Sequence, residues 1–401
     1  MRKMMDSGIH WIGYIPADWQ VRKAKYCIRL SNGSDPQTEG NIPVYGSGSG
    51  SFKTCGEFKE GPAVLVGRKG TINAPQYITG QYWNVDTAFD IKAQEHFDLR
   101  YYFYLACSFD YPFYKSPTTT LPSMTQTAYE NMPIPAPALP EQRRIAAYLE
   151  HYCATIDALI ANQQQQIEKL KQYKQAVITE AVTHGLDSNV QMKDSRVEWI
   201  GAVPEHWELH RIAYLYEERK EPGADDLPLL QVSINTGVSD HEMAEDEQDR
   251  VFIRMEDKTK YKRVYPGDLT YNMMRAWQGA FGAVRVNGMV SPAYVVAKPR
   301  GNASIDTRYF EALLRTHSAT EEMHRYSHGI MDFRLRLYWP EFRNIRVCLP
   351  PFEEQQRIAA FIDEKSAQID ALIAVKQKKA DKLAQYKKSL IYEVVTGKQE
   401  V

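Results

Sequence analysis

The sequence predicts an α+β protein: two globular mixed α/β domains joined by two long helices that form an antiparallel coiled coil, built by tandem duplication with a pseudo-twofold axis. Three observations support this prediction. Two stretches without glycine or proline, Glu141–Thr183 and Glu354–Thr396, repeat each other without a gap. The segments that precede them also repeat, in the same order. Those segments hold short apolar runs bounded by glycine and proline, which is typical of strands and turns.

The composition is that of a globular protein of two or three domains. The chain has 401 residues, a hydrophobic share of 43%, a charged share of 25% and a net charge of −1. No apolar run is long enough to cross a bilayer, and MRKMMDSGIH lacks the apolar region of a signal peptide. We therefore expect a cytoplasmic protein with no membrane partner. The five cysteines form no CxxC pair, which indicates reduced thiols.

The duplication sets the expected domain boundaries. Asp6–Gln20 returns as Asp194–Glu208 in the frame D-S-x-(I/V)-x-W-I-G-x-(I/V)-P-x-x-W, and a D-x-R-Y motif at 98–101 returns at 306–309. We predict a first globular domain over 1–139 and a helix over 140–185. A second globular domain over 186–350 and a second helix over 351–397 follow.

Each repeated stretch is expected to be a single helix. The two stretches align at an offset of 213 residues, and 23 of the 43 aligned pairs are identical. Apolar residues at alternating spacings of four and three predict a coiled-coil seam. The predicted seam includes Ile156, Leu159 and Leu170 in the first helix and Ile369, Leu372 and Leu383 in the second. About 43 residues make a rod of roughly 65 Å, which is too long for an ordinary core helix.

Polar residues interrupt this seam at the same place in both helices. Gln163 and Gln166 occupy it in the first helix, and Lys376 and Lys379 in the second. An antiparallel pair would bring the two polar centres together, so we predict that the helices pair with each other. In the alternative arrangement, each helix packs on its own domain or on another protein.

No enzyme motif is complete in this chain. A Walker A loop is absent, and HWELH at 206–210 is not HExxH because its glutamate is misplaced. Ser291–Tyr294 has alanine where the catalytic loop of amino-methyltransferases has its second proline, and no cofactor-binding glycine motif accompanies it. We therefore predict no catalytic residue, no metal site and no cofactor bound by this chain.

Several polar and basic loops suit DNA instead. Hydroxyls and cations contact phosphates, arginine pairs with guanine, and glutamine pairs with adenine. A solvated turn is the alternative for the cations of the 67–71 turn, and salt bridges are the alternative for those at 334–336. An acidic run at 240–249 opposes DNA binding, and we expect it to lie away from phosphates. The candidate DNA-binding residues are Ser47, Ser49, Lys53, Arg68, Lys69, Thr71, Lys115, Thr118 and Thr119 in the first domain, and Asn272, Arg275, Trp277, Gln278, Arg334 and Arg336 in the second.

The chain resembles the specificity subunits of type I restriction–modification systems over essentially its whole length. The resemblance is carried by the repeated opening frame, by the E-Q-x-x-I-A helix starts within 137–146 and 350–359, and by YNMMRAWQGAFG followed by VSPAY. Motifs shared by both halves would dock partner subunits, and the candidates are Trp11, Trp19, Trp199, Trp207, Arg144 and Arg357.

This resemblance implies a non-catalytic subunit. Each globular domain would be a target recognition domain that reads one half of a split double-stranded DNA site, and the helices would set the spacer. Two modification subunits would methylate adenine N6 with S-adenosylmethionine, and restriction subunits would use ATP and Mg²⁺ to cleave unmethylated DNA. The competing hypothesis is a non-DNA adaptor with two interaction domains on a coiled-coil ruler, which the near-neutral charge favours.

Overall fold

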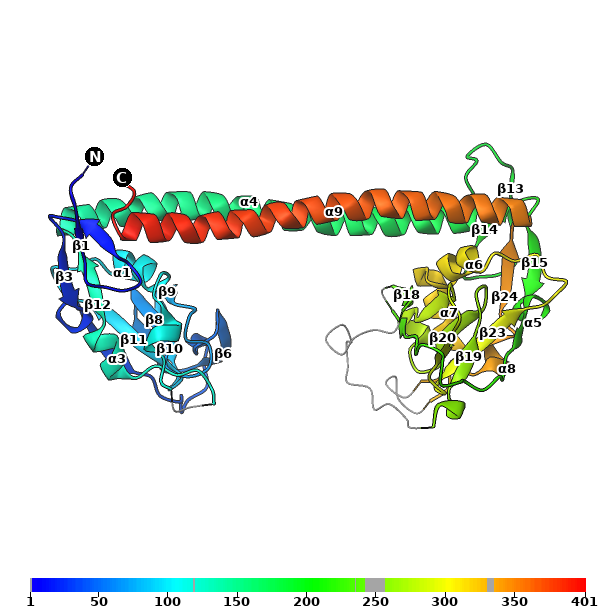
Figure 1. Ribbon diagram of the computed structural model, residues 1–401, viewed down its shortest axis with the longest axis horizontal. Helices are drawn as coiled ribbons and strands as arrows, with labels where there is room; N and C mark the ends of the chain where they lie inside the picture. Colours follow the sequence, from blue (N-terminus) through cyan, green and yellow to red (C-terminus); the bar gives the residue numbers. More distant parts are fainter. Residues whose placement is uncertain (1, 118–119, 235, 242–256, 330–334) are drawn as a thin grey trace. The chain divides into compact units, whose positions relative to one another are not determined.

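The computed structural model describes residues 2–117, 120–234, 236–241, 257–329 and 335–401. They fold into two compact units, here called the first unit (Met1–Gln166 with Lys376–Val401) and the second unit (Ile167–Val375). Two long helices, α4 (Leu139–His184) and α9 (Phe352–Val395), run through both units (Figure 1). Each unit therefore contains the beginning of one long helix and the end of the other. A search of the described residues finds no helix that is both long and apolar enough to cross a membrane.

The first unit is built on an antiparallel sheet of order β4-β11-β8-β9 and a mixed sheet of order β6-β5-β10-β7. Every residue of β8 is buried, as expected of an apolar strand covered on both faces. The strands are β1 (Met4–Asp6), β2 (Tyr14–Pro16), β3 (Gln20–Lys23), β4 (Ile28–Asn32), β5 (Ile42–Tyr45), β6 (Ser51–Cys55), β7 (Lys59–Glu60), β8 (Ala63–Gly67), β9 (Gln76–Ile78), β10 (Gln81–Asn84), β11 (Ala88–Ala93) and β12 (Pro133–Ala136). The short helices are η1 (Ala24–Tyr26), α1 (Leu99–Ala106), α2 (Tyr111–Tyr114) and α3 (Gln126–Asn131).

The second unit repeats this plan around an antiparallel sheet of order β16-β23-β20-β21. The pairs β13-β14 and β15-β24 correspond to β1-β2 and β3-β12 of the first unit. The strands are β13 (Met192–Asp194), β14 (Ala202–Pro204), β15 (Glu208–Arg211), β16 (Tyr216–Glu218), β17 (Val232–Ser233), β18 (Gly237–Val238), β19 (Lys262–Val264), β20 (Leu269–Asn272), β21 (Phe281–Ala283), β22 (Gly288–Val290), β23 (Tyr294–Pro299) and β24 (Arg346–Leu349). The helices are α5 (Ile212–Leu215), η3 (Lys258–Lys260), η4 (Ala276–Gln278), α6 (Thr307–Leu314), α7 (His317–Arg325) and α8 (Trp339–Phe342).

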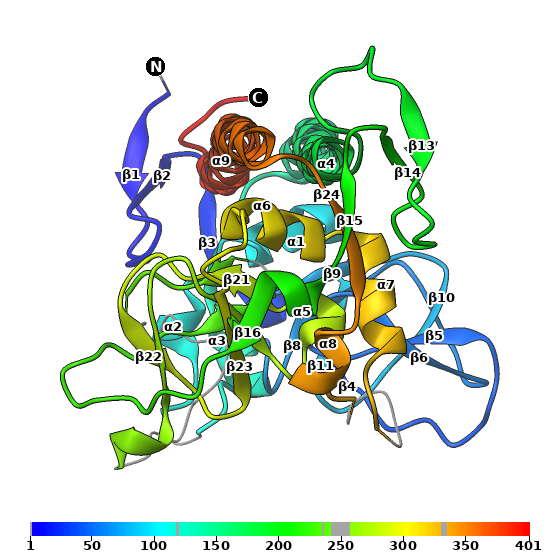
Figure 2. The same cartoon turned by 90° about the vertical axis from the view of Figure 1, so that its right-hand side faces the viewer.

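The two long helices lie side by side and antiparallel, as predicted (Figures 1 and 2). In the first unit Lys387 Nζ donates to both carboxylate oxygens of Asp157, at 2.6 and 2.7 Å. In the second unit Lys174 Nζ does the same to Asp370, at 2.7 and 2.9 Å. The two lysines are equivalent at the repeat offset of 213 residues, and so are the two aspartates. The helix pair therefore makes the same ion pair twice, as a pseudo-twofold arrangement requires.

The seam of this coiled coil differs from the predicted one at alternate positions. Ile156 and Ile369 are buried and Leu170 and Leu383 are half-buried, in agreement with the prediction. Leu159 and Leu372 are 47% and 51% exposed, so their assignment to the seam is wrong. The observed seam of α4 follows Cys153, Ile156, Ile160, Gln163, Ile167, Leu170 and Lys174. The sequence carries apolar residues both three and four positions after Ile156, and the helix pair buries the fourth.

Matching hydrogen bonds tie each globular domain to the beginning of a long helix. In the first unit the Gln142 carboxamide accepts from the backbone N–H of Asp98 at 2.8 Å. In the second unit Gln355 accepts from the N–H of Asp306 at 2.9 Å. Both aspartates also cap the short helix that follows them, α1 or α6. The glutamine of the E-Q helix start thus positions the globular domain against the helix.

The end of the other long helix is held in the same way. The Tyr101 hydroxyl donates to the carbonyl of Val395 at 3.2 Å, and the Tyr309 hydroxyl donates to that of Val182 at 3.0 Å. Both hydroxyls are fully buried, and they satisfy carbonyls in the last turn of a helix. The repeated D-x-R-Y and E-Q motifs are therefore structural: they lock each globular domain onto both long helices.

Candidate nucleic-acid interface

Three loops of the first unit that the sequence singles out converge in space. The side chain of Gln76 holds the glycine-rich loop by donating to the carbonyl of Gly46 at 3.0 Å and accepting from the N–H of Gly50 at 2.9 Å. The Cβ of any residue replacing Gly70 would lie 3.4 Å from the Ser47 hydroxyl, so the basic turn at 67–71 lies against this loop. The 115–124 segment joins them, because Gly70 N–H donates to Pro122 O at 2.9 Å.

The candidate side chains of these loops are mostly exposed. Arg68 is the best anchored, because its guanidinium donates to the Asp86 carbonyl at 3.3 Å and lies 5.9 Å from the ring centre of Phe89. Thr118 and Thr119 lie outside the described residues. The exposed candidates are Ser49, Lys53, Lys69, Thr71 and Lys115, while Ser47 and Arg68 are half-buried. This edge can therefore present hydroxyls and cations together to a polyanion.

In the second unit two segments meet at the end of β20. Leu337 N–H donates to the carbonyl of Met273 at 2.9 Å, which places residues 335–337 beside the 272–278 segment. Trp277 packs edge-on against His324 of α7, with ring centres 5.6 Å apart, and its indole N–H donates to Met274 O at 3.1 Å. Together these contacts bring Trp277 and Gln278 to the same part of the unit as Arg336.

The candidate DNA-binding residues of the second unit differ in their exposure to solvent. Gln278 and Arg336 are exposed, and Arg275 is half-buried. Leu335 and Leu337 are buried on either side of Arg336, so the predicted alternation holds over the described residues. Arg334 and most of the acidic run lie outside the described residues. Asn272 is buried, and its side chain accepts from Met274 N–H at 3.0 Å, so the structure gives it a structural role, and its contact with DNA stays a prediction.

Some exposed apolar side chains beside these loops were missed by the sequence analysis. Phe52 and Leu121 flank the first-unit loops and Met274 lies in the second-unit segment, and all three are exposed. Lys53 lies 5.6 Å from the ring centre of Phe52. The sequence could have revealed Phe52 and Leu121, because a large apolar residue inside a glycine-rich or threonine-rich loop rarely belongs to a core.

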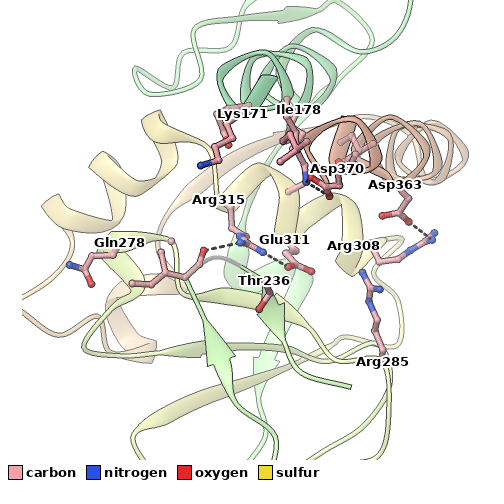
Figure 3. A pocket seen from close by; sticks show the side chains of 18 residues that line it. Lys171, Ile178, Thr236, Gln278, Arg285, Arg308, Glu311, Arg315, Asp363 and Asp370 are labelled. Atoms are coloured by element: carbon pink, nitrogen blue, oxygen red, sulfur yellow. Dashed lines mark hydrogen bonds and ion pairs between the residues drawn. The ribbon is translucent and has the colours of Figure 1, made fainter. Parts of the chain in front are cut away.

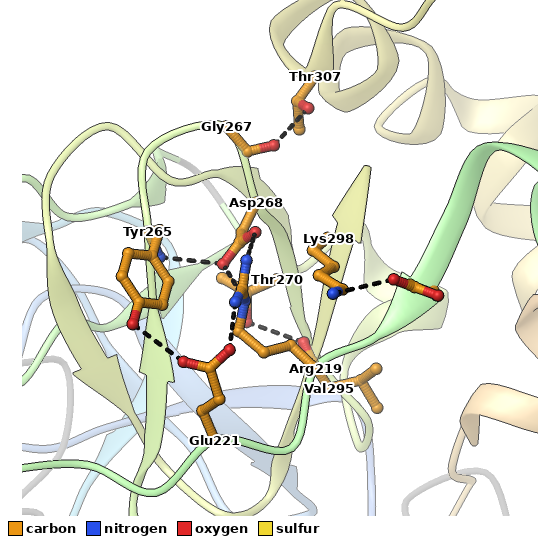
Figure 4. Close-up of polar contacts among 10 residues, drawn as sticks. Arg219, Glu221, Tyr265, Gly267, Asp268, Thr270, Val295, Lys298 and Thr307 are labelled. Carbon is orange, nitrogen blue, oxygen red and sulfur yellow. Dashed lines mark hydrogen bonds and ion pairs between the residues drawn. The ribbon is translucent and has the colours of Figure 1, made fainter. Parts of the chain in front are cut away.

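Strand β20, which leads to this segment, is anchored by a buried ionic network (Figure 4). Asp268 is 2% exposed and accepts from Arg219 Nε and Nη2, at 2.9 and 3.1 Å, and from the N–H of Tyr265 at 2.9 Å. Burial raises the pKa of the Asp268 carboxyl, while the Arg219 hydrogen bonds act in the opposite direction. Glu221 accepts from Arg219 and from the Tyr265 hydroxyl, and the latter hydrogen bond is the main reason that its pKa is lowered.

No group of three or more metal-ligating side chains occurs among the described residues. Burial raises the pKa of the Cys27 thiol to about 11, so this thiol is little ionised at neutral pH.

Comparison with known proteins finds similarity to type I restriction specificity proteins. Residues 16–169 match the model of the type I restriction modification DNA specificity domain. Two proteins of Methanocaldococcus jannaschii are also similar to this chain. The type I restriction enzyme MjaVIII specificity subunit is 26% identical over 312 residues, which cover 72% of this chain and 68% of the relative. The chain is thus similar to type I restriction specificity subunits.

The other comparisons agree. The putative type I restriction enzyme MjaX specificity subunit is 24% identical over 294 residues, covering 70% of this chain and 62% of the relative. A chain from a structure of the type I R-M system, solved to explain complex assembly and conformational transition, has a TM-score of 0.68 at 15% identity and covers 96% of this chain and 99% of its own length. The HsdS subunit of Thermoanaerobacter tengcongensis has a TM-score of 0.51 at 16% identity, with 96% and 98% covered. At these identities the two structures show a shared fold.

Two of the candidate docking tryptophans form hydrogen bonds within the protein. The indole N–H of Trp19 donates to Glu141 at 3.1 Å, and that of Trp207 donates to Glu354 at 3.2 Å. Both indoles are buried, as is Trp199, and the docking role of these three tryptophans stays a prediction. Trp11 is half-buried against Phe109, and Arg144 and Arg357 are exposed; docking by these three residues stays a prediction.

Exposed apolar residues recur at repeat-equivalent positions of this chain. Scattered exposed apolar residues are normal, whereas a patch of them that is kept in both copies marks a candidate contact surface. The equivalent exposed pairs are Met4 and Met192, Val21 and Leu209, Tyr26 and Tyr214, Leu159 and Leu372, and Tyr173 and Tyr386. The ion-pair register places Leu159 beside Tyr386 on one edge of the helix pair in the first unit, and Leu372 beside Tyr173 in the second.

Proposed function

We propose that this chain is the DNA sequence-recognition subunit of a type I restriction–modification complex. Each globular domain reads one half of a bipartite double-stranded DNA site. The observation that carries this proposal is the contrast between frame and loops. The sheet order, the helix locks and the Asp–Lys pairs repeat in both units, whereas the converging loops differ in sequence and length. Two different half-sites require this combination, because the frame fixes position and the loops read bases.

The proposed chemistry of reading is the pairing of side chains with base edges. Arg275 and Arg336 suit the guanine O6 and N7 acceptors, and Gln278 suits adenine N6 and N7. Lys53, Lys69 and the hydroxyls of the first unit suit phosphates and flanking bases. The helix pair sets the number of base pairs between the half-sites. The subunit itself is proposed to be non-catalytic and cytoplasmic.

Catalysis is assigned to partner subunits. Two modification subunits methylate adenine with S-adenosylmethionine, and restriction subunits use ATP and Mg²⁺. The pseudo-twofold repeat supports two equivalent docking sites. We place these sites on the exposed Leu–Tyr edges of the helix pair, Leu159 with Tyr386 and Tyr173 with Leu372, because they are apolar, exposed and present once in each unit.

Fluorescence anisotropy with labelled duplexes tests the DNA-binding proposal against the adaptor hypothesis. The full chain, assembled with its modification subunits, is expected to bind a random duplex at low salt and to lose affinity steeply as salt rises. Absence of binding at low salt would leave the adaptor as the better explanation.

Replacing Arg275 by alanine is expected to weaken binding at one half-site. A bidentate contact to guanine contributes about 1–3 kcal/mol of discrimination, so competition duplexes altered in the second unit's half-site should lose their disadvantage. Lys260→Ala, an exposed change elsewhere in the second unit, is the control. An equal loss on every duplex would instead identify Arg275 as a phosphate contact.

Replacing the Leu–Tyr edge of one unit is expected to remove one modification subunit. Mass photometry of Leu159→Ser with Tyr386→Ser should show one bound copy where the unaltered chain binds two, because polar side chains lose the apolar contact. Tyr152→Ser is the matched control, since Tyr152 is exposed on α4 but its repeat equivalent is Lys365. Two copies bound with unchanged affinity would exclude this edge as the docking site.

A further inference from the structure

The second unit contains a cavity of about 900 Å³ between its parts of the long helices and the globular domain (Figure 3). Lys171 and Lys174 line it from α4, Arg308 from α6, Arg315 from the position just after α6, and Arg285 from the turn after β21. Figure 3 shows Arg285 rising from this turn toward Arg308. Five cations around one cavity raise the question of what neutralises them.

Three of these cations are matched by carboxylates of the same cavity. Glu311 uses both oxygens, one for Arg315 Nη1 at 2.9 Å and one for the N–H of Ala283 at 3.0 Å. Asp370 accepts from Lys174 through both oxygens.

Arg308, the third of these, faces two carboxylates. It forms a 2.9 Å ion pair with Asp306 and a 3.5 Å ion pair with Asp363. No carboxylate that lines the cavity is therefore left to pair with Lys171 or Arg285.

Lys171 and Arg285 have no carboxylate partner that lines the cavity. Among the described residues, Lys171 forms an ion pair with Glu168, three residues earlier on the same exposed helix, and such surface pairs contribute little. Arg285 makes no ion pair within 4.0 Å among the described residues. The pKa of Asp240 is lowered chiefly by its hydrogen bond from His241, and Arg285 contributes least to this shift. Arg285 and Lys171 thus face a cavity whose carboxylates are already engaged.

We infer that this cavity receives backbone phosphates of the half-site read by the second unit. The inference rests on the proposed function and adds a backbone contact at the junction of helix α4 with the globular domain. Phosphate oxygens supply the negative partner that Arg285 lacks and a second one for Lys171, and the exposed Thr236 hydroxyl adds a neutral donor. Gln278 lines the same cavity, so a strand whose base meets Gln278 brings its own phosphates to this place.

The equivalent place in the described part of the first unit is smaller and differently lined. Arg100, which corresponds to Arg308, forms an ion pair with Glu150, which corresponds to Asp363. The cavity beside them measures about 330 Å³, and Tyr77 lines it with its ring centre 4.9 Å from the Arg100 guanidinium. Both units thus share the ion pair between this arginine and the long helix, while the larger cavity lined by five cations lies in the second unit.

The test is the affinity and salt dependence of DNA binding for Arg285→Ala and Lys171→Ala. The full chain with its modification subunits is titrated with a duplex that carries its methylation site and with a scrambled duplex. Each variant is expected to bind both duplexes about tenfold more weakly at low salt, with the ratio between them unchanged. The slope of log affinity against log salt should become shallower by about 0.9 for each lost phosphate contact.

Matched controls are Lys169→Ala on the same helix and Arg343→Ala at the end of α8, which remove the same charge outside the cavity and should leave binding unchanged. Equal thermal unfolding of all four variants establishes that the fold is intact. A changed ratio between the two duplexes would mean that the cavity reads bases, and unchanged affinity would mean that DNA does not enter it; either result overturns the inference.

Inorganic phosphate provides the second arm. If phosphate binds the unaltered chain and Arg285→Ala abolishes this binding without affecting DNA affinity, the cavity holds a free anion and the inference fails. Competition between phosphate and DNA that Arg285→Ala removes supports it. If the unaltered complex binds no DNA at all, the proposed function fails first and this inference falls with it, whereas loss of the inference alone leaves DNA binding of the unaltered complex intact.

Discussion

At the scale of single residues, Asp268 shows how a buried charge supports the interface. The carboxylate lies just before β20, the strand that ends at the 272–278 segment. Its cost of burial is offset by Arg219, which is itself only 15% exposed at the side chain. A buried ion pair is worth little relative to apolar packing, but removing one partner is costly because the other is left uncompensated.

Arg219→Ala is therefore expected to destabilise the second unit by about 3–5 kcal/mol, measured by urea unfolding. Lys298→Ala should cost no more than about 1 kcal/mol, since its pair with Glu217 is well exposed and Arg300 also binds Glu217 (Figure 4). A similar loss in both variants would show that Asp268 does not depend on its partner.

The loss of folding stability caused by Arg219→Ala should also depend on pH. Without Arg219, the buried Asp268 carboxyl has a pKa further above its ordinary value of 3.8, so the folded state binds a proton more tightly than the unfolded chain. The loss is then largest at neutral pH and shrinks on acidification toward the range below that raised pKa. A loss that grows on acidification would contradict this assignment.

At the scale of elements, the long helices show what sequence patterns predict well and where they fail. Their existence, repeat and antiparallel pairing follow from the offset of 213 residues and from the matching polar centres. The seam register does not follow, because Leu159 and Ile160 both satisfy an alternating spacing and only packing selects between them. The loops were found by composition, but the burial of Asn272 depends on a backbone turn that no residue pattern reveals.

Alanine substitution on α4 tests the observed register. Ile156→Ala should cost about 2–5 kcal/mol, because Ile156 is 5% exposed and its removal leaves a cavity in the seam. Leu159→Ala should change stability by less than about 0.5 kcal/mol, because Leu159 lies on the exposed edge. Thermal or urea unfolding of the two variants distinguishes the two seam registers. Equal losses of stability would support the register predicted from the sequence.

At the scale of the whole molecule, the duplication gives one chain two globular domains, each of which contacts both long helices. Each domain is locked to both helices by the same glutamine, tyrosine and glutamate contacts. A change in helix length is therefore transmitted to both domains. This is the physical basis for proposing that the helices set the DNA spacer.

Inserting four residues into both helices, after Gln164 and after its equivalent Gln377, is expected to lengthen the DNA spacer and leave the half-sites unchanged. Four residues add about 6 Å of helix and slightly more than one turn, which a coiled coil accommodates as a stutter. At about 3.4 Å per base pair this amounts to roughly one to two base pairs. Insertion into only one helix is the control and should prevent stable pairing.

Long-read mapping of methylated adenines in cells that carry this chain with its modification subunits tests the central claim most directly. The account predicts methylation within a two-part sequence whose halves are separated by a gap of fixed length and unspecified bases. Methylation confined to one uninterrupted sequence, or half-sites separated by gaps of varying length, would contradict it.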